Sequence, residues 1–202
     1  MKRISILAVA LCSALAGNAS MADANVEAGA AKSVVCQACH GANGNSVNPD
    51  WPSLAGLGAD YIAAQLANFK SGKRNNAIMM ANVMTLTPED MADLGAYFGG
   101  LVNTGLEADP TYWKAGEKLF RGGDKARGIP ACMACHGPTG YGNEPAKFPA
   151  LRGQHSEYLA KQLADYASGA RTTGPNAIMQ TIAKRLSPDD MRNVASYAQG
   201  LR

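Results

Sequence analysis

Two short stretches of the chain share one spacing of cysteine and histidine: Cys36–Gly41 and Cys132–Gly137 both read Cys-x-x-Cys-His-Gly. Two thiols about one helical turn apart can each form a thioether with a vinyl group of haem, and the adjacent histidine can bind the iron. Cys-x-x-Cys also occurs in zinc sites and redox dithiols, but two copies that both end in His-Gly favour two covalent haem c groups. The predicted thioether cysteines are Cys36, Cys39, Cys132 and Cys135, and the predicted proximal iron ligands are His40 and His136.

The fifth cysteine, Cys12, lies in an N-terminal segment that is typical of an export signal. Lys2 and Arg3 precede a short apolar run, and small residues follow it, with possible cleavage after Ala19 or Ala22. We therefore predict a signal peptide over residues 1–22 and a periplasmic location, which suits bacterial haem attachment. The apolar run is too short to span a bilayer, so the mature protein is expected to be soluble or peripherally membrane-associated.

The two motifs belong to an internal repeat, which predicts two domains. Matching segments follow each motif at nearly constant spacing: Trp51–Leu54 with Phe148–Leu151, Tyr61–Leu66 with Tyr158–Leu163, Asn76–Met79 with Asn176–Met179, and Leu86–Met91 with Leu186–Met191. The predicted units are an N-terminal domain over 23–102, a linker over 103–109 and a C-terminal domain over 110–202.

Both units are expected to be all-α, with helices joined by irregular loops. A hydroxyl residue, a proline and two acidic residues predict helix starts at Thr87 and Ser187. Middle helices are expected over 61–69 and 158–166, and first helices over about 26–35 and 110–120. Units of this size bury little core of their own, and a haem between the helices would add apolar surface.

Counting histidines limits the choice of the second axial ligand. Only His155 remains after the two motifs, and its matching position holds Gly58, so we expect it to be a solvated residue at a helix start. Methionine is the other common ligand in electron-transfer cytochromes. Met79 and Met179 match in the repeat and lie in a predicted irregular segment, which makes them the predicted sixth ligands. Met91 and Met191 also match, but their place inside a helix predicts core packing.

Together these features resemble the dihaem class I cytochromes c of the cytochrome c4 family. The resemblance implies two tandem class I cytochrome c domains related by a pseudo-twofold axis, with haem propionates near the domain interface. It also implies close packing of the first and last helices at Gly29 and Gly116. Pro52 and Pro149 could each place a carbonyl against a proximal histidine. Haem contact, or a place in the core or interface, is expected for Trp51, Tyr61, Gln65, Tyr158 and Gln162.

Irons with every ligand position filled exchange electrons and have no open site for a substrate. The resemblance accordingly implies a periplasmic electron carrier, and not an enzyme, that takes electrons from a quinol-oxidising complex towards a terminal haem-copper oxidase. Two alternatives stay open: the cytochrome subunit of a periplasmic dehydrogenase, and a dihaem peroxidase. We expect a monomer with redox protein partners.

The charge is divided unevenly between the two halves. Residues 23–106 hold four basic and seven acidic side chains, net −3, whereas residues 107–202 hold thirteen and nine, net +4. The near-neutral total does not suggest nucleic-acid binding.

Overall fold

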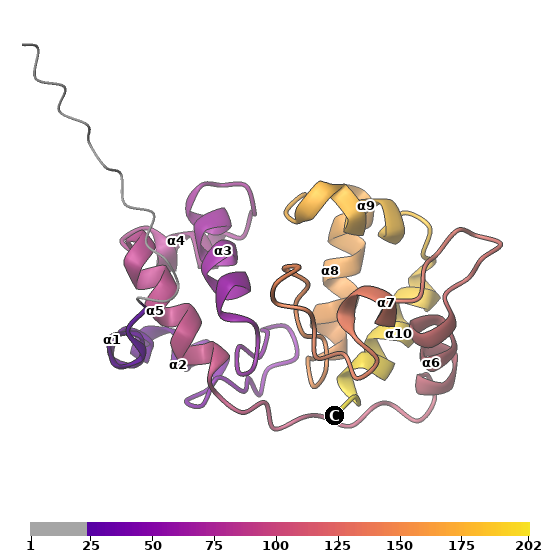
Figure 1. The fold of residues 1–202 in the computed structure, drawn as a ribbon, viewed down its shortest axis with the longest axis horizontal. Coiled ribbons are helices and arrows are strands. Elements are labelled where there is room, and N and C mark those ends of the chain that lie inside the picture. Colours follow the sequence, from indigo (N-terminus) through magenta and orange to yellow (C-terminus); the bar gives the residue numbers. More distant parts are fainter. Residues whose placement is uncertain (1–23) are drawn as a thin grey trace, which may run out of the picture.

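Two helical bundles lie side by side, joined by one extended connection (Figure 1). The computed structural model describes residues 24–202, so the predicted signal peptide and Cys12 lie outside the described residues. Within that range the β-type pairing amounts to three isolated bridges, and helices make up the regular structure. The all-α prediction is therefore confirmed.

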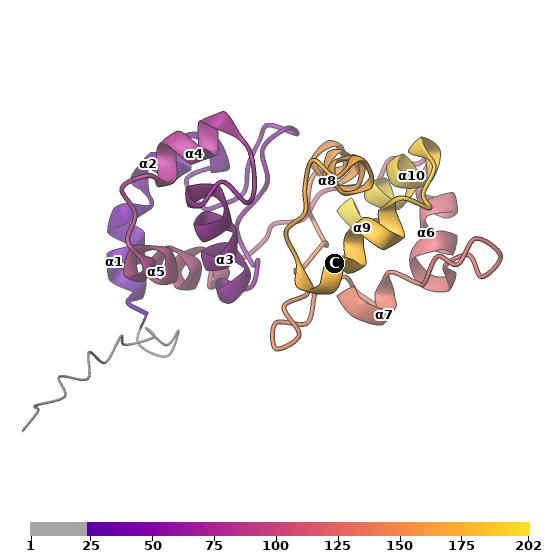
Figure 2. The same ribbon diagram turned by 90° about the horizontal axis from the view of Figure 1, so that it is seen from above.

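Each bundle contains the same succession of helices. The N-terminal bundle consists of α1 (Val26–Lys32), α2 (Val34–His40), α3 (Ala59–Lys70), α4 (Ala77–Val83) and α5 (Pro88–Gly99). The C-terminal bundle consists of α6 (Trp113–Gly122), α7 (Met133–His136), α8 (Ser156–Ser168), a 3-10 turn (Pro175–Ala177), α9 (Ile178–Ala183) and α10 (Pro188–Gln199). The view from above shows the two bundles as two separate groups of helices (Figure 2).

The last helix of each bundle begins as its sequence predicts. In α5 the Thr87 hydroxyl accepts a hydrogen bond from the Asp90 amide at 3.1 Å, and the Asp90 carboxylate accepts one from the Thr87 amide at 2.8 Å. Ser187 and Asp190 form the same reciprocal pair at the start of α10. These bonds satisfy amides that have no partner within the helix, and so fix where α5 and α10 start.

The last helices form the centre of each bundle because two other helices pack on them. α5 packs against α1 and α3, and α10 packs against α6 and α8. Two glycines allow the closest of these approaches. A Cβ atom at Gly29 would lie 2.1 Å from the carbonyl oxygen of Asp93, and one at Gly116 would lie 2.0 Å from that of Asn193. The predicted close packing of first and last helices is confirmed.

Met91 and Met191 lie on the buried faces of these central helices. Their exposed fractions are 5% and 8%, and Met191 packs in a cluster with Leu119, Phe120 and Tyr197. The prediction that both are core residues is confirmed.

The linker is hydrogen-bonded to both bundles. Asn45 of the N-terminal bundle donates from its side chain to the carbonyl of Val102 and accepts from the amide of Thr104. Gln199 of α10 donates to the carbonyl of Glu107. The first helix after the linker begins at Trp113 and not at residue 110, because Asp109 first closes a turn by accepting from the Thr111 amide at 2.7 Å. Within residues 24–202, no helix combines the length and the hydropathy needed to cross a bilayer.

Candidate haem-binding sites

Both motif histidines sit at the C-terminal ends of short helices that the motifs themselves form. His40 ends α2 and His136 ends α7, and each residue is 7% exposed. Nδ1 of His40 lies 2.8 Å from the carbonyl oxygen of Pro52, and Nδ1 of His136 lies 2.8 Å from that of Pro149. A carbonyl only accepts, so Nδ1 carries the proton and Nε2 keeps its lone pair for a metal.

Burial also shifts the pKa values of the histidines and cysteines in the two motifs. It lowers the pKa of His40 and of His136, which favours the neutral imidazole that binds iron. Burial raises the pKa of the Cys36 thiol, and it raises that of Cys132 to about 11. Within residues 24–202 these thiols are half-buried and form no disulfide.

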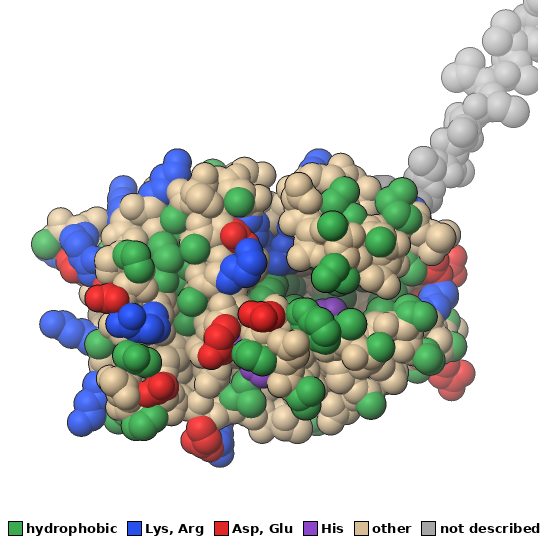
Figure 3. Space-filling view, turned by 180° about the vertical axis from the view of Figure 1, so that it is seen from behind, with side chains coloured by type: hydrophobic (Ala, Val, Ile, Leu, Met, Phe, Trp, Pro, Cys, Tyr) green, Lys and Arg blue, Asp and Glu red, His purple; other side chains and the backbone are tan. Residues whose placement is uncertain are grey.

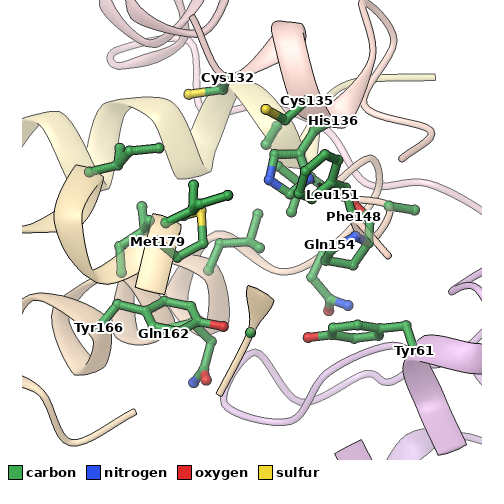
Figure 4. A pocket seen from close by; sticks show the side chains of 18 of the residues that line it. Tyr61, Cys132, Cys135, His136, Phe148, Leu151, Gln154, Gln162, Tyr166 and Met179 are labelled. Atoms are coloured by element: carbon green, nitrogen blue, oxygen red, sulfur yellow. Dashed lines mark hydrogen bonds between the residues drawn. The ribbon is translucent and has the colours of Figure 1, made fainter. Parts of the chain in front are cut away.

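A largely apolar cavity of about 670 Å³, here called the C-terminal cavity, is lined mostly by the C-terminal bundle and also by residues of α3 in the N-terminal bundle. Cys132, Cys135 and His136 line it from the α7 side, and Met179 lines it from α9 (Figure 4). The cavity size is that of a cofactor or small-molecule site. Thus three predicted haem-linked residues of the motif share one cavity with the predicted sixth ligand.

The methionine segments differ in one respect from the prediction. Met79 and Met179 were expected in irregular segments, but each lies in the first turn of a helix, α4 and α9, and is half-buried. In α4 the Asn76 side chain caps the helix by accepting from the Met79 amide at 3.0 Å. The matching Asn176 instead has a left-handed backbone, so the cap that orders α4 is replaced by a 3-10 turn before α9.

The one remaining histidine contradicts its prediction. His155 does precede a helix, α8, but it is 6% exposed and not solvated. Its Nε2 lies 2.8 Å from the carbonyl oxygen of Ser46 in the other bundle. Beside it, the Gln154 side chain both accepts from the amide and donates to the carbonyl of Ser53, at 2.9 and 2.8 Å. His155 therefore belongs to a buried polar seam between the bundles.

The matched tyrosines and glutamines meet in a second part of this interface. Tyr61 and Gln65 on α3 face Tyr158 and Gln162 on α8, around two buried arginines that the sequence reasoning missed. Arg74 and Arg171 occupy equivalent positions, each nine residues after the glutamine of its own repeat, and that match could have revealed them. Trp51, the remaining aromatic residue of the predicted set, is 37% exposed and so does not belong to the buried core.

Comparison with known proteins identifies the family to which this chain belongs. The sequence model of the cytochrome c family matches residues 26–101 and again 113–202. Cytochrome c4 of Pseudomonas aeruginosa is 48% identical over 175 residues, which cover 86% of this chain and 87% of that protein. The chain belongs to the cytochrome c4 family.

Membership of the cytochrome c4 family agrees with the fold. Reduced recombinant cytochrome c4 from Pseudomonas stutzeri has a TM-score of 0.86 with this structure at 43% identity, covering 89% of this chain and 100% of that one. The prediction of two tandem class I cytochrome c domains is confirmed, and the chain is a dihaem electron-transfer protein. A relative from Thiomonas intermedia, named thiosulfate dehydrogenase electron acceptor, is 40% identical over 95% of this chain and 88% of that protein.

The residues present suit the haem groups that the cytochrome c4 family implies. Each bundle offers a pair of thiols, a neutral buried imidazole with a free Nε2, and a thioether sulfur on a neighbouring helix. The C-terminal cavity adds an apolar enclosure around three of these groups. That donor set is the one class I cytochromes c use.

Proposed function

We propose that the chain carries one haem c in each domain, over residues 23–102 and 110–202, and transfers single electrons in the periplasm. The observation that carries this proposal is the shared cavity of His136, Met179 and the two motif cysteines. The proposed ligand sets are Cys36, Cys39, His40 and Met79 in the first domain, and Cys132, Cys135, His136 and Met179 in the second.

Bound haem supplies an iron centre that changes by one electron, and the chain decides how that centre behaves. The Pro52 and Pro149 carbonyls hold the histidine rings in one tautomer and orientation. A methionine sulfur is a weak donor that favours the reduced state, so both potentials are expected to be high. With the sixth position taken, no substrate can bind, and the chain acts as a carrier and not as an enzyme.

The proposed route runs from a quinol-oxidising membrane complex towards a terminal haem-copper oxidase. The chain would serve it as a monomeric carrier that is soluble or bound at the membrane surface. Support comes from the family and from the predicted export signal over residues 1–22.

The number of covalent haems is the first test of the proposal. The purified, exported protein should give two c-type haems per chain in the pyridine haemochrome assay, and both should resist extraction with acidified acetone. A Cys132→Ala/Cys135→Ala variant should retain one. A single haem in the wild-type protein, or an extractable haem, would contradict the proposal.

A second candidate function is that of an electron acceptor for a periplasmic dehydrogenase. The relative named thiosulfate dehydrogenase electron acceptor, 40% identical over nearly the whole chain, favours it. Stopped-flow mixing separates the two candidates. Reduction by a thiosulfate dehydrogenase and thiosulfate that outpaces reduction by a quinol-oxidising complex would support the dehydrogenase partner.

The two haems are expected to differ in potential because the halves differ in charge. Basic side chains gather on the C-terminal domain, the left half of the view in Figure 3, in line with its net charge of +4 against −3. Positive charge favours reduction, so the C-terminal haem should have the higher potential. Solvent screening limits the difference to roughly 10–40 mV. Redox titration at low salt, with each haem assigned through the Met79→Ala and Met179→Ala variants, measures the order; a higher N-terminal potential would show that haem burial outweighs surface charge.

A further inference from the structure

Two arginines from different domains lie against each other in the interface. Arg74 follows α3, Arg171 follows α8, and their backbones form an antiparallel bridge. Although arginine is rarely buried, their exposed fractions are only 8% and 4%. The Arg74 guanidinium lies 4.5 Å from the ring centre of Phe69, and that of Arg171 lies 4.6 Å from the ring centre of Tyr166.

Each arginine bonds to both domains in a reciprocal pattern. Arg74 donates to Gln65 in its own domain and to Tyr158 and Gln162 in the other, at 2.8–3.0 Å. Arg171 donates to Gln162 in its own domain and to Tyr61 and Gln65 in the other, over the same range of distances. Its Nε also donates to the Thr173 hydroxyl at 3.2 Å. The network therefore has twofold character, and neither arginine belongs to one domain alone.

All of these acceptors are neutral, which leaves two buried positive charges without a counter-charge. Within residues 24–202, no carboxylate lies within 4 Å of either guanidinium, although eight other ion pairs occur there. Taking one unpaired cation out of water costs several kcal/mol, and two adjacent cations also repel. A guanidinium has five N–H donors, so the hydrogen bonds among the described residues leave at least one on each arginine for an anion.

The pKa of the neighbouring Tyr61 hydroxyl reflects the positive electrostatic potential around the two arginines. Burial alone raises the pKa of the Tyr61 hydroxyl, but the charges of Arg171 and Arg74 outweigh it, and the pKa is lowered. The cluster thus favours negative charge even on a group that is ordinarily neutral.

The arginine cluster meets one end of the C-terminal cavity through Arg171, whereas Arg74 lies outside the lining and donates hydrogen bonds to three residues that belong to it, Gln65, Tyr158 and Gln162. Arg171, Tyr61 and Gln162 line the cavity, and Tyr61 and Gln162 lie at the end away from Cys132 and Cys135 (Figure 4). Haem carries its two carboxylates on the edge opposite the vinyl groups that form thioethers. A haem attached at Cys132 and Cys135 would therefore direct its carboxylates towards this end of the cavity.

We propose that Arg74 and Arg171 form one shared carboxylate-binding site for haem propionates, so that the arginine of each domain sets the potential of the haem in the other. The proposal rests on the proposed function, since it needs haem in the cavity. Guanidinium groups bind carboxylates in a fork, which makes arginine better suited to this place than lysine. Loss of one arginine would leave propionate charge uncompensated in both domains, and would make both irons harder to reduce.

The test measures one haem at a time across the interface. In a Met79→Ala background the N-terminal haem is marked by its altered ligand, and the C-terminal potential can be read separately. Adding Arg74→Gln, a change in the N-terminal domain, should shift the redox equilibrium of the C-terminal haem at least tenfold towards the oxidised form, about 59 mV for one electron. Arg171→Gln in a Met179→Ala background should do the same to the N-terminal haem.

Lys73→Gln is the matched control, because it removes the same charge from the exposed neighbour of Arg74. It should shift the equilibrium less than twofold, since water and salt screen it. If Arg74→Gln does not fold, Arg74→Lys keeps the charge without the fork and should give a smaller shift in the same direction. Equal shifts for Arg74→Gln and Lys73→Gln would overturn the proposal.

Two further outcomes distinguish other failures. A wild-type potential that changes when phosphate replaces chloride at constant ionic strength would show that a solution anion fills the site, and would overturn the proposal in favour of that anion. A Met79→Ala protein whose haem spectra match those of the wild type would contradict the proposed ligand and thus the proposed function. The arginine variants, measured without that background, would still show whether the potentials move.

Discussion

Replacing Met179 by alanine is expected to produce the largest functional change in this chain, a fall in the potential of the C-terminal haem on the order of 0.1 V. Axial ligands set haem potentials over a range of about 0.8 V, and loss of the thioether removes the ligand that favours the reduced iron. Met179 lines the cavity with His136, so its removal should also open the site to carbon monoxide or cyanide. Spectroelectrochemical titration and ligand-binding spectra measure both effects, and Met79→Ala should act in the same way on the other haem.

Met191→Ala is the control for that variant, because Met191 is a buried core residue of α10 and lies outside the predicted ligand set. It should lower the free energy of unfolding by about 2–5 kcal/mol, with little change in either potential. If Met191→Ala or Met91→Ala, and not the proposed ligand variants, abolished the weak far-red band of methionine-bound ferric haem, the assignment of Met79 and Met179 would be wrong.

Replacing Gly116 by alanine is expected to cause the largest loss of stability from a single methyl group. The new Cβ would lie 2.0 Å from the carbonyl oxygen of Asn193 and 2.8 Å from the Cβ of Tyr197. These atoms cannot rotate away, so α6 would have to separate from α10. We expect a cost of about 3 kcal/mol, the upper end for overpacked cores, and a fall in Tm of about 6–12 °C for a chain of this size.

Gly122→Ala in the same helix is the matched control. A Cβ there meets nothing within 4 Å, and the residue is exposed. Alanine also favours a helix over glycine by up to about 1 kcal/mol, so this variant should be neutral or slightly more stable. Thermal unfolding followed by circular dichroism compares the two, and equal Tm values would show that α6 and α10 are not in close contact in solution.

Local chemistry explains why much of this molecule could be predicted from its sequence. The Cys-x-x-Cys-His spacing acts within one helical turn, and the Thr87 and Ser187 caps depend on residues three positions away. The repeat then narrowed the choice of axial ligand, since only two pairs of methionines occupy matching positions in the two units. The close approaches at Gly29 and Gly116 followed from the family resemblance and not from any local pattern.

What could not be predicted depends on contacts between the two units. His155 looked like a solvated helix start because its own repeat gave it no partner, and its acceptor is the Ser46 carbonyl in the other domain. The roles of Arg74 and Arg171 were hidden for the same reason. Met79 and Met179 both lie in the first turn of a helix, but Asn76 caps α4 whereas the matching Asn176 has a left-handed backbone, so identical residues begin the two helices in different ways.

The buried hydrogen bonds between the domains also affect how the molecule moves. Gln154 holds Ser53 by two buried bonds and His155 holds Ser46 by a third, so a hinge motion would have to break three bonds away from water. The exposed bonds of the linker to both bundles add to this restraint. The two halves should therefore tumble in solution as one body, with a single rotational correlation time. A partner bound to one domain therefore always has the other domain in the same orientation. Diffusion of one domain relative to the other does not limit electron exchange between them.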